Sequence, residues 1–216
     1  MGICVDDLKR ILTCRTMLGS LTLTTTCLAC DHILQLPAVA SSTYGRAVVD
    51  NFSHGMVGAV SWAIVVLAIP PCSLRQLAEV ILCGLLASLL DVDHFIAARS
   101  FELKEVLALP FRPPLHSTTL IFLIAIFLLL GVRLASSSQY LQSLPYMFVV
   151  ATFSHQLRDA SRRGLWFWPL GSTPPLPYCI YILSVILLPI STRLVMERID
   201  PWLLKYSTGH TSQFNV

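Results

Sequence analysis

The stretch Leu120–Leu130, LIFLIAIFLLL, decides the fold class of this chain, because every one of its side chains is apolar. It lies inside a longer, predominantly apolar segment, Leu115–Leu134. An α-helix needs about 20 such residues to cross the hydrocarbon core of a bilayer. The pattern therefore predicts that Leu115–Leu134 is a membrane-spanning helix.

The composition extends this interpretation to the whole chain. Of its 216 residues, 55% are hydrophobic and only 12% are charged, and the mean hydropathy is +0.70. Soluble domains carry about 25% charged residues, so half of the usual charged surface is missing. The net charge of +3 is spread along the chain without a basic block, which argues against a nucleic-acid partner. The expected partner is the lipid bilayer.

Five further segments have the length and apolarity of membrane spans. The six expected spans are Met17–Leu36, Phe52–Ile69, Leu77–Ile96, Leu115–Leu134, Tyr140–Leu157 and Pro177–Met196. The predicted fold is all-α, a polytopic transmembrane helix bundle with about six spans, and the expected location is a membrane that the chain crosses repeatedly. The predicted domains are an N-terminal extramembrane segment at 1–16, a transmembrane helical domain at 17–196 and a C-terminal tail at 197–216.

Histidines and aspartates gather at one membrane face when successive spans alternate in direction. The start of an even-numbered span and the end of an odd-numbered span then share a face. Asp31 and His32 join this face at the end of the first span, and His210 is the one histidine that does not. Ionisable groups in membrane spans cost about 2.5 kcal/mol or more each and usually mark a functional site. The residues that converge in this way are His54, Asp91, Asp93, His94, His116, His155 and Asp159.

The spacing of these seven residues is compatible with metal ligation. Asp91 and His94 are three residues apart, and His155 and Asp159 are four apart, so each pair can share a helix face. Histidine nitrogens and carboxylate oxygens are the usual ligands of zinc, manganese or iron. We therefore predict that the seven residues hold a divalent metal, with zinc and manganese as the candidates. A single histidine or aspartate at a span end is more often a solvated interface residue, but seven together favour a metal or proton-handling site.

Arginines accompany this cluster. Arg158, Arg162 and Arg163 surround Asp159, and Arg112 lies shortly before the fourth expected span. A guanidinium group can bind two oxygens of one phosphate at once. Arg112, Arg158 and Arg162 are therefore candidate binding residues for a lipid or another phosphate-bearing substrate. The residues alone leave open the alternative that these arginines contact anionic lipid headgroups.

Several motifs resemble the transmembrane protein 267 family. They are DNFSH at Asp50–His54, DVDHF at Asp91–Phe95, RPPLH at Arg112–His116 and SHQLRD at Ser154–Asp159, in that order along the chain. This resemblance implies a multi-pass membrane protein but no particular activity.

The same motifs are more distantly similar to a family of bacterial inner-membrane proteins described as metal-dependent hydrolases. The family pattern runs Asp-x-Asp-His, His-Arg-Gly-x-Thr-His-Ser and His-x-x-x-Asp. This resemblance implies hydrolysis of phosphodiesters with a metal cofactor. Phe111 stands where the family has the first histidine of its second motif, and the segment after Asp159 is shorter by one or two residues. The family pattern is matched here by Asp91, Asp93, His94, Arg112, His116, Ser117, His155 and Asp159.

Three functional hypotheses follow. The first is a metal-dependent, phosphoesterase-like hydrolase, in which the metal lowers the pKa of a water toward about 7 and Asp93 or Asp159 is the general base. The second is a non-enzymatic membrane protein that keeps the polar cluster for structure or for binding a partner. The third is a cation or proton pathway through the same cluster. Phe111 favours the second hypothesis, and the number of matching ligands favours the first.

Overall fold

A computed structural model describes residues 13–66, 73–135 and 139–200 of the chain. The structure is helical apart from two short antiparallel strands, which confirms the all-α prediction. The strands are β1 (Trp166–Phe167) and β2 (Gly171–Ser172). The helices are α2 (Cys14–Gln35), α3 (Pro37–Ala40), α4 (Thr43–Val66), α5 (Leu74–Leu89), α6 (Val92–Ala98), α7 (Leu103–Leu107), the 3-10 helix η1 (Pro114–His116), α8 (Thr118–Ala135), α9 (Gln139–Gln142), α10 (Leu144–Arg163) and α11 (Tyr178–Ile199).

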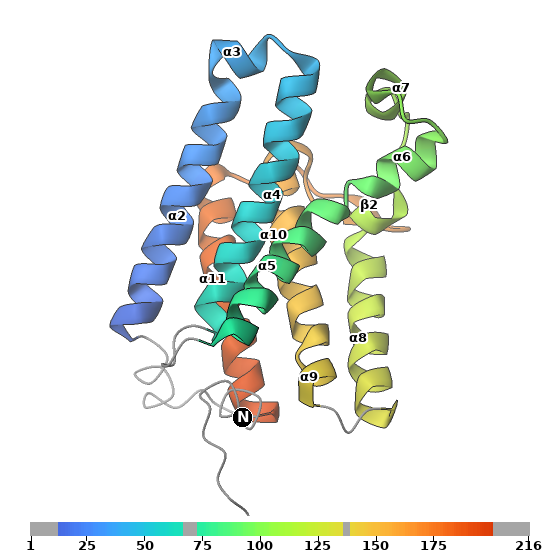
Figure 1. The fold of residues 1–216 in the computed structure, drawn as a ribbon. Helices are drawn as coiled ribbons and strands as arrows, with labels where there is room; N and C mark the ends of the chain where they lie inside the picture. Colours follow the sequence, from blue (N-terminus) through green and yellow to red (C-terminus); the bar gives the residue numbers. More distant parts are fainter. Residues whose placement is uncertain (1–12, 67–72, 136–138, 201–216) are drawn as a thin grey trace, which may run out of the picture.

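The long helices form a bundle in which the chain runs up and down, as Figure 1 shows. Helix α10 is the central element, because it packs against α4, α5, α8 and α11. Helix α2 packs on the outer side of α4 and also contacts α11. The short elements α3, α6, α7 and the β1–β2 hairpin lie toward the end of the bundle that is uppermost in Figure 1.

Three helical segments among the described residues are long and apolar enough to cross a membrane: Leu74–Ala98, Thr118–Ala135 and Tyr178–Ile199. They correspond to the third, fourth and sixth expected spans. Helices α2, α4 and α10 have comparable lengths but carry more polar side chains. The transmembrane helix bundle is therefore supported, and the count of six spans stays a prediction.

The observed helix ends differ from the expected span ends. Helix α4 begins at Thr43, well before the expected start at Phe52, because Ser42 caps it: the Ser42 hydroxyl accepts the N–H of Gly45 at 3.0 Å. The third expected span is interrupted between α5 and α6. Apolarity marks the part of a helix that faces lipid, whereas capping residues set where the helix begins. The predicted segments 1–16 and 197–216 lie mostly outside the described residues, and their bounds stay predictions.

Close packing of α4 against α5 depends on small residues. A Cβ atom at Gly84 would lie 2.8 Å from the carbonyl oxygen of Gly55, so the two backbones approach too closely for any side chain there. Small residues allow such close approach in membrane bundles, where packing rather than water exclusion holds helices together. The helices are also joined by reciprocal hydrogen bonds, from Asn51 Nδ2 to the carbonyl oxygen of Ser88 (2.8 Å) and from Ser88 Oγ to that of Asn51 (3.0 Å).

Candidate metal centre

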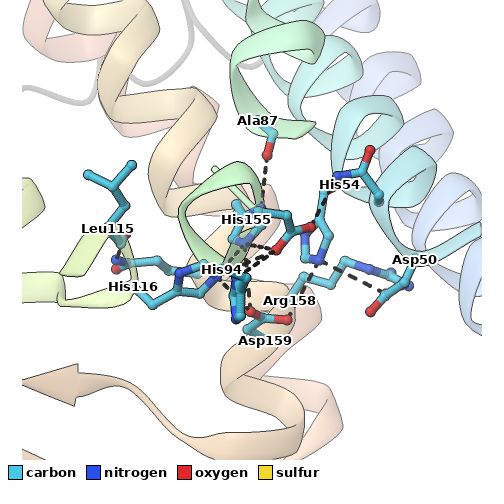
Figure 2. Close-up of polar contacts among 12 residues, drawn as sticks. Asp50, His54, Ala87, His94, Leu115, His116, His155, Arg158 and Asp159 are labelled. Carbon is cyan, nitrogen blue, oxygen red and sulfur yellow. Dashed lines mark hydrogen bonds and ion pairs between the residues drawn. The ribbon is translucent and has the colours of Figure 1, made fainter. Parts of the chain in front are cut away.

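The structure brings all seven predicted cluster residues together where α4, α5, α6, η1 and α10 meet. Figure 2 labels five of them: His54, His94, His116, His155 and Asp159. His54 lies in the middle of α4 rather than at a helix start, and Asp91 lies in the turn that interrupts the third expected span. Asp93 and His94 belong to α6, His116 to η1, and His155 and Asp159 to α10. Their convergence is a finding of the structure, whereas their roles as metal ligands stay predictions.

Four ligand atoms form the centre of the cluster: Nε2 of His116, Nε2 of His155, Oδ1 of Asp91 and Oδ2 of Asp159. The two imidazole nitrogens lie 3.1 Å apart. Each of them lies 3.6 Å from both carboxylate oxygens. In a tetrahedral site with ligand distances of about 2.0–2.2 Å, neighbouring ligand atoms are about 3.3–3.6 Å apart. The four nitrogen–oxygen separations therefore match those around one tetrahedral ion, and the separation of the two nitrogens is slightly shorter.

The two central imidazole rings are oriented by their other nitrogens. Nδ1 of His155 lies 2.9 Å from the carbonyl oxygen of Ala87, so this nitrogen donates its proton to the backbone. Nδ1 of His116 lies 3.3 Å from Oδ2 of Asp93. In neutral rings of these tautomers, both Nε2 atoms present a lone pair, which is the form of histidine that binds metals. The donor set fits a divalent metal that binds both neutral rings, whereas without a metal a protonated His116 can donate its Nε2–H to Nε2 of His155.

Asp93 lies behind the central group. Its Oδ2 accepts the backbone N–H of Leu115 at 2.9 Å in addition to facing His116. Its Oδ1 lies 3.2 Å from Nδ1 of His94, although both of these atoms are buried and the pair lacks hydrogen-bond geometry. Both oxygens of Asp93 are thus directed at protein groups, and the side chain orients the His116 ring.

The electrostatic field of the cluster favours positive charge. Burial disfavours the protonated ring of His116, but hydrogen bonds with Asp91 and Asp93 outweigh burial and raise the pKa of His116 to about 9. Carboxylates that hold a proton on a buried imidazole would also stabilise a cation that replaces this proton.

His54 extends the cluster along α4. Its ring stacks on that of His155 with centroids 3.8 Å apart, and its Nε2 lies 3.6 Å from Oδ1 of Asp159 and 3.9 Å from Oδ1 of Asp50. Asp50, His54 and Asp159 form a further group with metal-binding geometry. The predicted site did not include Asp50. Its position four residues before His54 was the signal, since this is the same spacing that relates His155 to Asp159.

Two of the predicted substrate-binding arginines form ion pairs with aspartates of the bundle. Arg158 is buried, with Nη1 2.7 Å from Asp31 and Nη2 3.4 Å from Asp50. Arg162 binds Asp50 at 2.7 Å and Asp159 at 2.9 Å. These ion pairs fix the carboxylates of Asp50 and Asp159 relative to the histidines. Asp31 thus reaches the cluster through Arg158, whereas its neighbour His32 is exposed on α2 and does not join.

A small pocket, partly open to solvent, adjoins the cluster. His116 and Asp159 line it, and so do Arg112 and Arg163. Arg112 donates hydrogen bonds to the carbonyl oxygens of Gly164, at 3.0 Å, and Arg163, and these bonds hold the end of α10. Phe111, at the position where the resembled family has a histidine, is 58% exposed and is not among the residues that line the pocket.

Sequence comparisons identify relatives of this chain. The family model described as YdjM inner membrane protein matches residues 49–211, a range that includes all seven predicted metal-binding residues. Transmembrane protein 267 of Mus musculus is 40% identical over 177 residues, 81% of this chain and 80% of the relative. The Danio rerio protein of the same name is 40% identical over 166 residues, 76% of this chain and 72% of the relative. The Xenopus laevis protein is 36% identical over 197 residues, 88% and 87% of the two chains.

No solved structure matches this chain. The sequence matches cover most of its length, and they include the helices that carry the histidines and aspartates. The chain therefore belongs to the YdjM inner membrane protein family, and its similar relatives in vertebrates carry the name transmembrane protein 267.

Proposed function

We propose that this membrane protein is a metal-dependent hydrolase of phosphoester substrates. The observation that carries the proposal is the 3.1 Å separation of the Nε2 atoms of His116 and His155, each of which lies 3.6 Å from two carboxylates. A cation bound by these two nitrogens and two carboxylates would account for their convergence at one place in the bundle.

The metal would be held by His116, His155, Asp91 and Asp159. Two nitrogen and two oxygen donors suit zinc, and manganese also accepts imidazole and carboxylate ligands. When bound, such an ion supplies a Lewis acid that acidifies water and stabilises negative charge on a phosphoryl oxygen. Asp93, through Nδ1 of His116, fixes the ring in the orientation that this ligation needs.

The two predicted general bases occupy different positions. Asp159 lines the pocket, whereas Asp93 directs both oxygens at histidine rings and a backbone N–H. Of the two, only Asp159 adjoins the pocket, so it would accept a proton from water through Oδ1, the oxygen that pairs with Arg162 and is not assigned to the metal. Hydrolysis breaks one P–O ester bond, the oxygen of water stays on phosphorus, and the alcohol leaves with a proton. Asp93 is then a positioning residue.

The predicted arginines divide in the same way. Arg112 lines the pocket and is proposed to contact a phosphate group of the substrate. Arg158 and Arg162 hold Asp31, Asp50 and Asp159 in ion pairs and are proposed to position the carboxylates. Because α8, whose first turn lines the pocket, is long and apolar enough to cross a membrane, a lipid with a phosphate-bearing headgroup is the proposed substrate class.

The same ion pairs support a second candidate, a non-enzymatic protein. Arg158 connects α2, α4 and α10 through Asp31 and Asp50, so part of the polar cluster stabilises the bundle whatever else it does. Ion pairs between helices need no metal, and this candidate predicts a metal-free protein.

Metal content separates the two candidates. The full chain is purified in detergent without chelator, and zinc and manganese are measured before and after dialysis against a chelator. The hydrolase proposal predicts near-stoichiometric metal, together with turnover of a chromogenic phosphoester that the chelator abolishes and added metal restores. Metal-free protein whose melting temperature is unchanged by added zinc or manganese would refute the proposal and support the non-enzymatic candidate.

A further inference from the structure

Arg163 has no assigned role in the site, although it lines the same pocket as His116 and Asp159. It is the last residue of α10, and its side chain is exposed. Within the described part of the chain, its guanidinium group has no hydrogen-bond or ion-pair partner. Its neighbour Arg162 differs, because aspartates occupy both of its terminal nitrogens. Arg163 therefore offers an unoccupied guanidinium at the mouth of the cluster.

A second polar group in the pocket wall also lacks a partner. Thr118 is only 6% exposed, and its hydroxyl oxygen makes no hydrogen bond with any residue that the structure describes. Buried hydroxyl groups nearly always have a hydrogen-bond partner. Thr118 lines the pocket at the first turn of α8, so a ligand in the pocket can be the missing partner. A hydroxyl group can donate its proton to an anion.

Two of the residues that line the pocket are arginines. Arg112 lines it together with Arg163. Burial and the nearby positive charge of Arg163 lower the pKa of Arg112. Two cations on one wall repel, and an anion between them removes the repulsion. The hydroxyl of Thr118 and the two arginines thus form a set of donors that suits an oxyanion.

We infer that Arg163, supported by Arg112 and Thr118, binds the phosphate group of the ligand at the mouth of the pocket. The planar guanidinium fork matches two phosphate oxygens at once. The bound phosphate then lies between the arginines and the wall formed by His116 and Asp159. This inference rests on the proposed function, because it assigns the substrate's anion to a pocket beside the proposed metal centre. The shared chemistry is a phosphate group, either free or on a lipid headgroup.

Phosphate binding to the purified full chain tests the inference directly. Binding of inorganic phosphate is measured by calorimetry for the wild type, Arg163→Ala, Arg163→Lys and the control Arg46→Ala. Arg46 is an exposed arginine of α4 that does not line the pocket. Removal of a charged hydrogen-bond donor should weaken phosphate binding by about tenfold or more. Lysine should rescue only partly, because an ammonium group lacks the planar fork. Arg46→Ala should bind phosphate as the wild type does.

A second arm identifies the source of the phosphate. The protein is reconstituted into discs of phosphatidylcholine with or without phosphatidic acid, and its apparent affinity for inorganic phosphate is compared. Weaker apparent affinity in the doped discs, seen in the wild type and absent in Arg163→Ala, supports the inference with a lipid headgroup as the ligand. Equal affinity in both discs, with loss in Arg163→Ala, supports it with a soluble phosphate as the ligand.

The failures of the two proposals are distinguishable because metal content is measured on the same samples. Arg163→Ala should keep the metal content of the wild type. Protein that holds metal but binds phosphate equally well with and without Arg163, or not at all, overturns the inference and leaves the metal site standing. Metal-free protein whose phosphate binding still depends on Arg163 refutes the hydrolase and supports this anion site.

Discussion

His116 and His155 face each other through Nε2 atoms that lie 3.1 Å apart, although 39 positions separate them along the chain. The other nitrogen of each ring is directed at a fixed oxygen, on Ala87 for His155 and on Asp93 for His116. With both Nδ1 protons used in this way, neither neutral ring has a proton left for the contact between them. Either a metal ion that binds both neutral rings or a proton held on His116 accounts for that contact. The two explanations differ in consequences that can be measured residue by residue.

Removal of a central ligand should remove the metal. We expect His155→Ala and Asp91→Ala each to lose most of the bound zinc or manganese, because both supply atoms 3.6 Å or less from the other central ligands. Elemental analysis of detergent-purified protein gives the metal-to-protein ratio. His32→Ala is the matched control, since His32 is an exposed histidine of α2 outside the cluster. Full metal content in His155→Ala would show that the central group is not the metal site.

Replacement of Asp93 should weaken metal binding without abolishing it. Asp93→Asn keeps the size of the side chain but removes the charge that faces Nδ1 of His116. Loss of such an orienting carboxylate typically lowers metal affinity by about 10–100-fold. A zinc titration with a competing chelator should therefore give a lower affinity and an unchanged stoichiometry. Loss of all zinc binding, as expected for His155→Ala, would instead identify Asp93 as a direct ligand.

The contact between α4 and α5 should not tolerate even a methyl group. In Gly84→Ala the new Cβ would meet the carbonyl oxygen of Gly55 at 2.8 Å, and overpacking of this kind costs about 1–3 kcal/mol. Gly131→Ala in α8 is the control, because nothing lies within 4 Å of its Cβ position. Alanine there should stabilise the helix by about 0.5–1 kcal/mol. Thermal unfolding in detergent should show a lower melting temperature for Gly84→Ala alone, and equal melting temperatures would contradict the close packing.

The apolar run Leu120–Leu130 was sufficient to predict the fold class, because few structures other than a membrane helix can bury it. Hydropathy could not locate the start of α4, where Ser42 caps a polar first half of the helix. The convergence of the cluster was nevertheless predictable. The prediction required only that successive spans alternate in direction. The earlier start of α4 does not change it, because His54 still lies against Asp159 of α10.

Sequence patterns could not predict which side chains would pair with each other. Successive residues of a helix point about 100° apart, so Arg162 and Arg163 face different surroundings although they are adjacent. Which of them meets aspartates depends on how α10 is rotated against α4, and this rotation is set by packing contacts between distant segments. The ion pair of Arg158 with Asp31 likewise requires α2 to lie beside α10. For the same reason the sequence could not separate Asp93, behind the centre, from Asp91 within it.

The number of membrane crossings can be measured by labelling single cysteines, with the seven native cysteines replaced. In sealed vesicles, cysteines at Ser41, Ser100 and Ser172 should react with an impermeant reagent from one side only. Cysteines at Leu74 and Ala135, at the opposite ends of α5 and α8, should react from the other side only. The positions bracket α4 and α10, whose polar side chains leave their crossing unproven by apolarity. After permeabilisation all five should react. If the cysteines at positions 135 and 172 react from the same side, α10 does not cross the membrane. The six-span prediction, which places His155 of α10 at the same membrane face as the other cluster residues, would then be wrong.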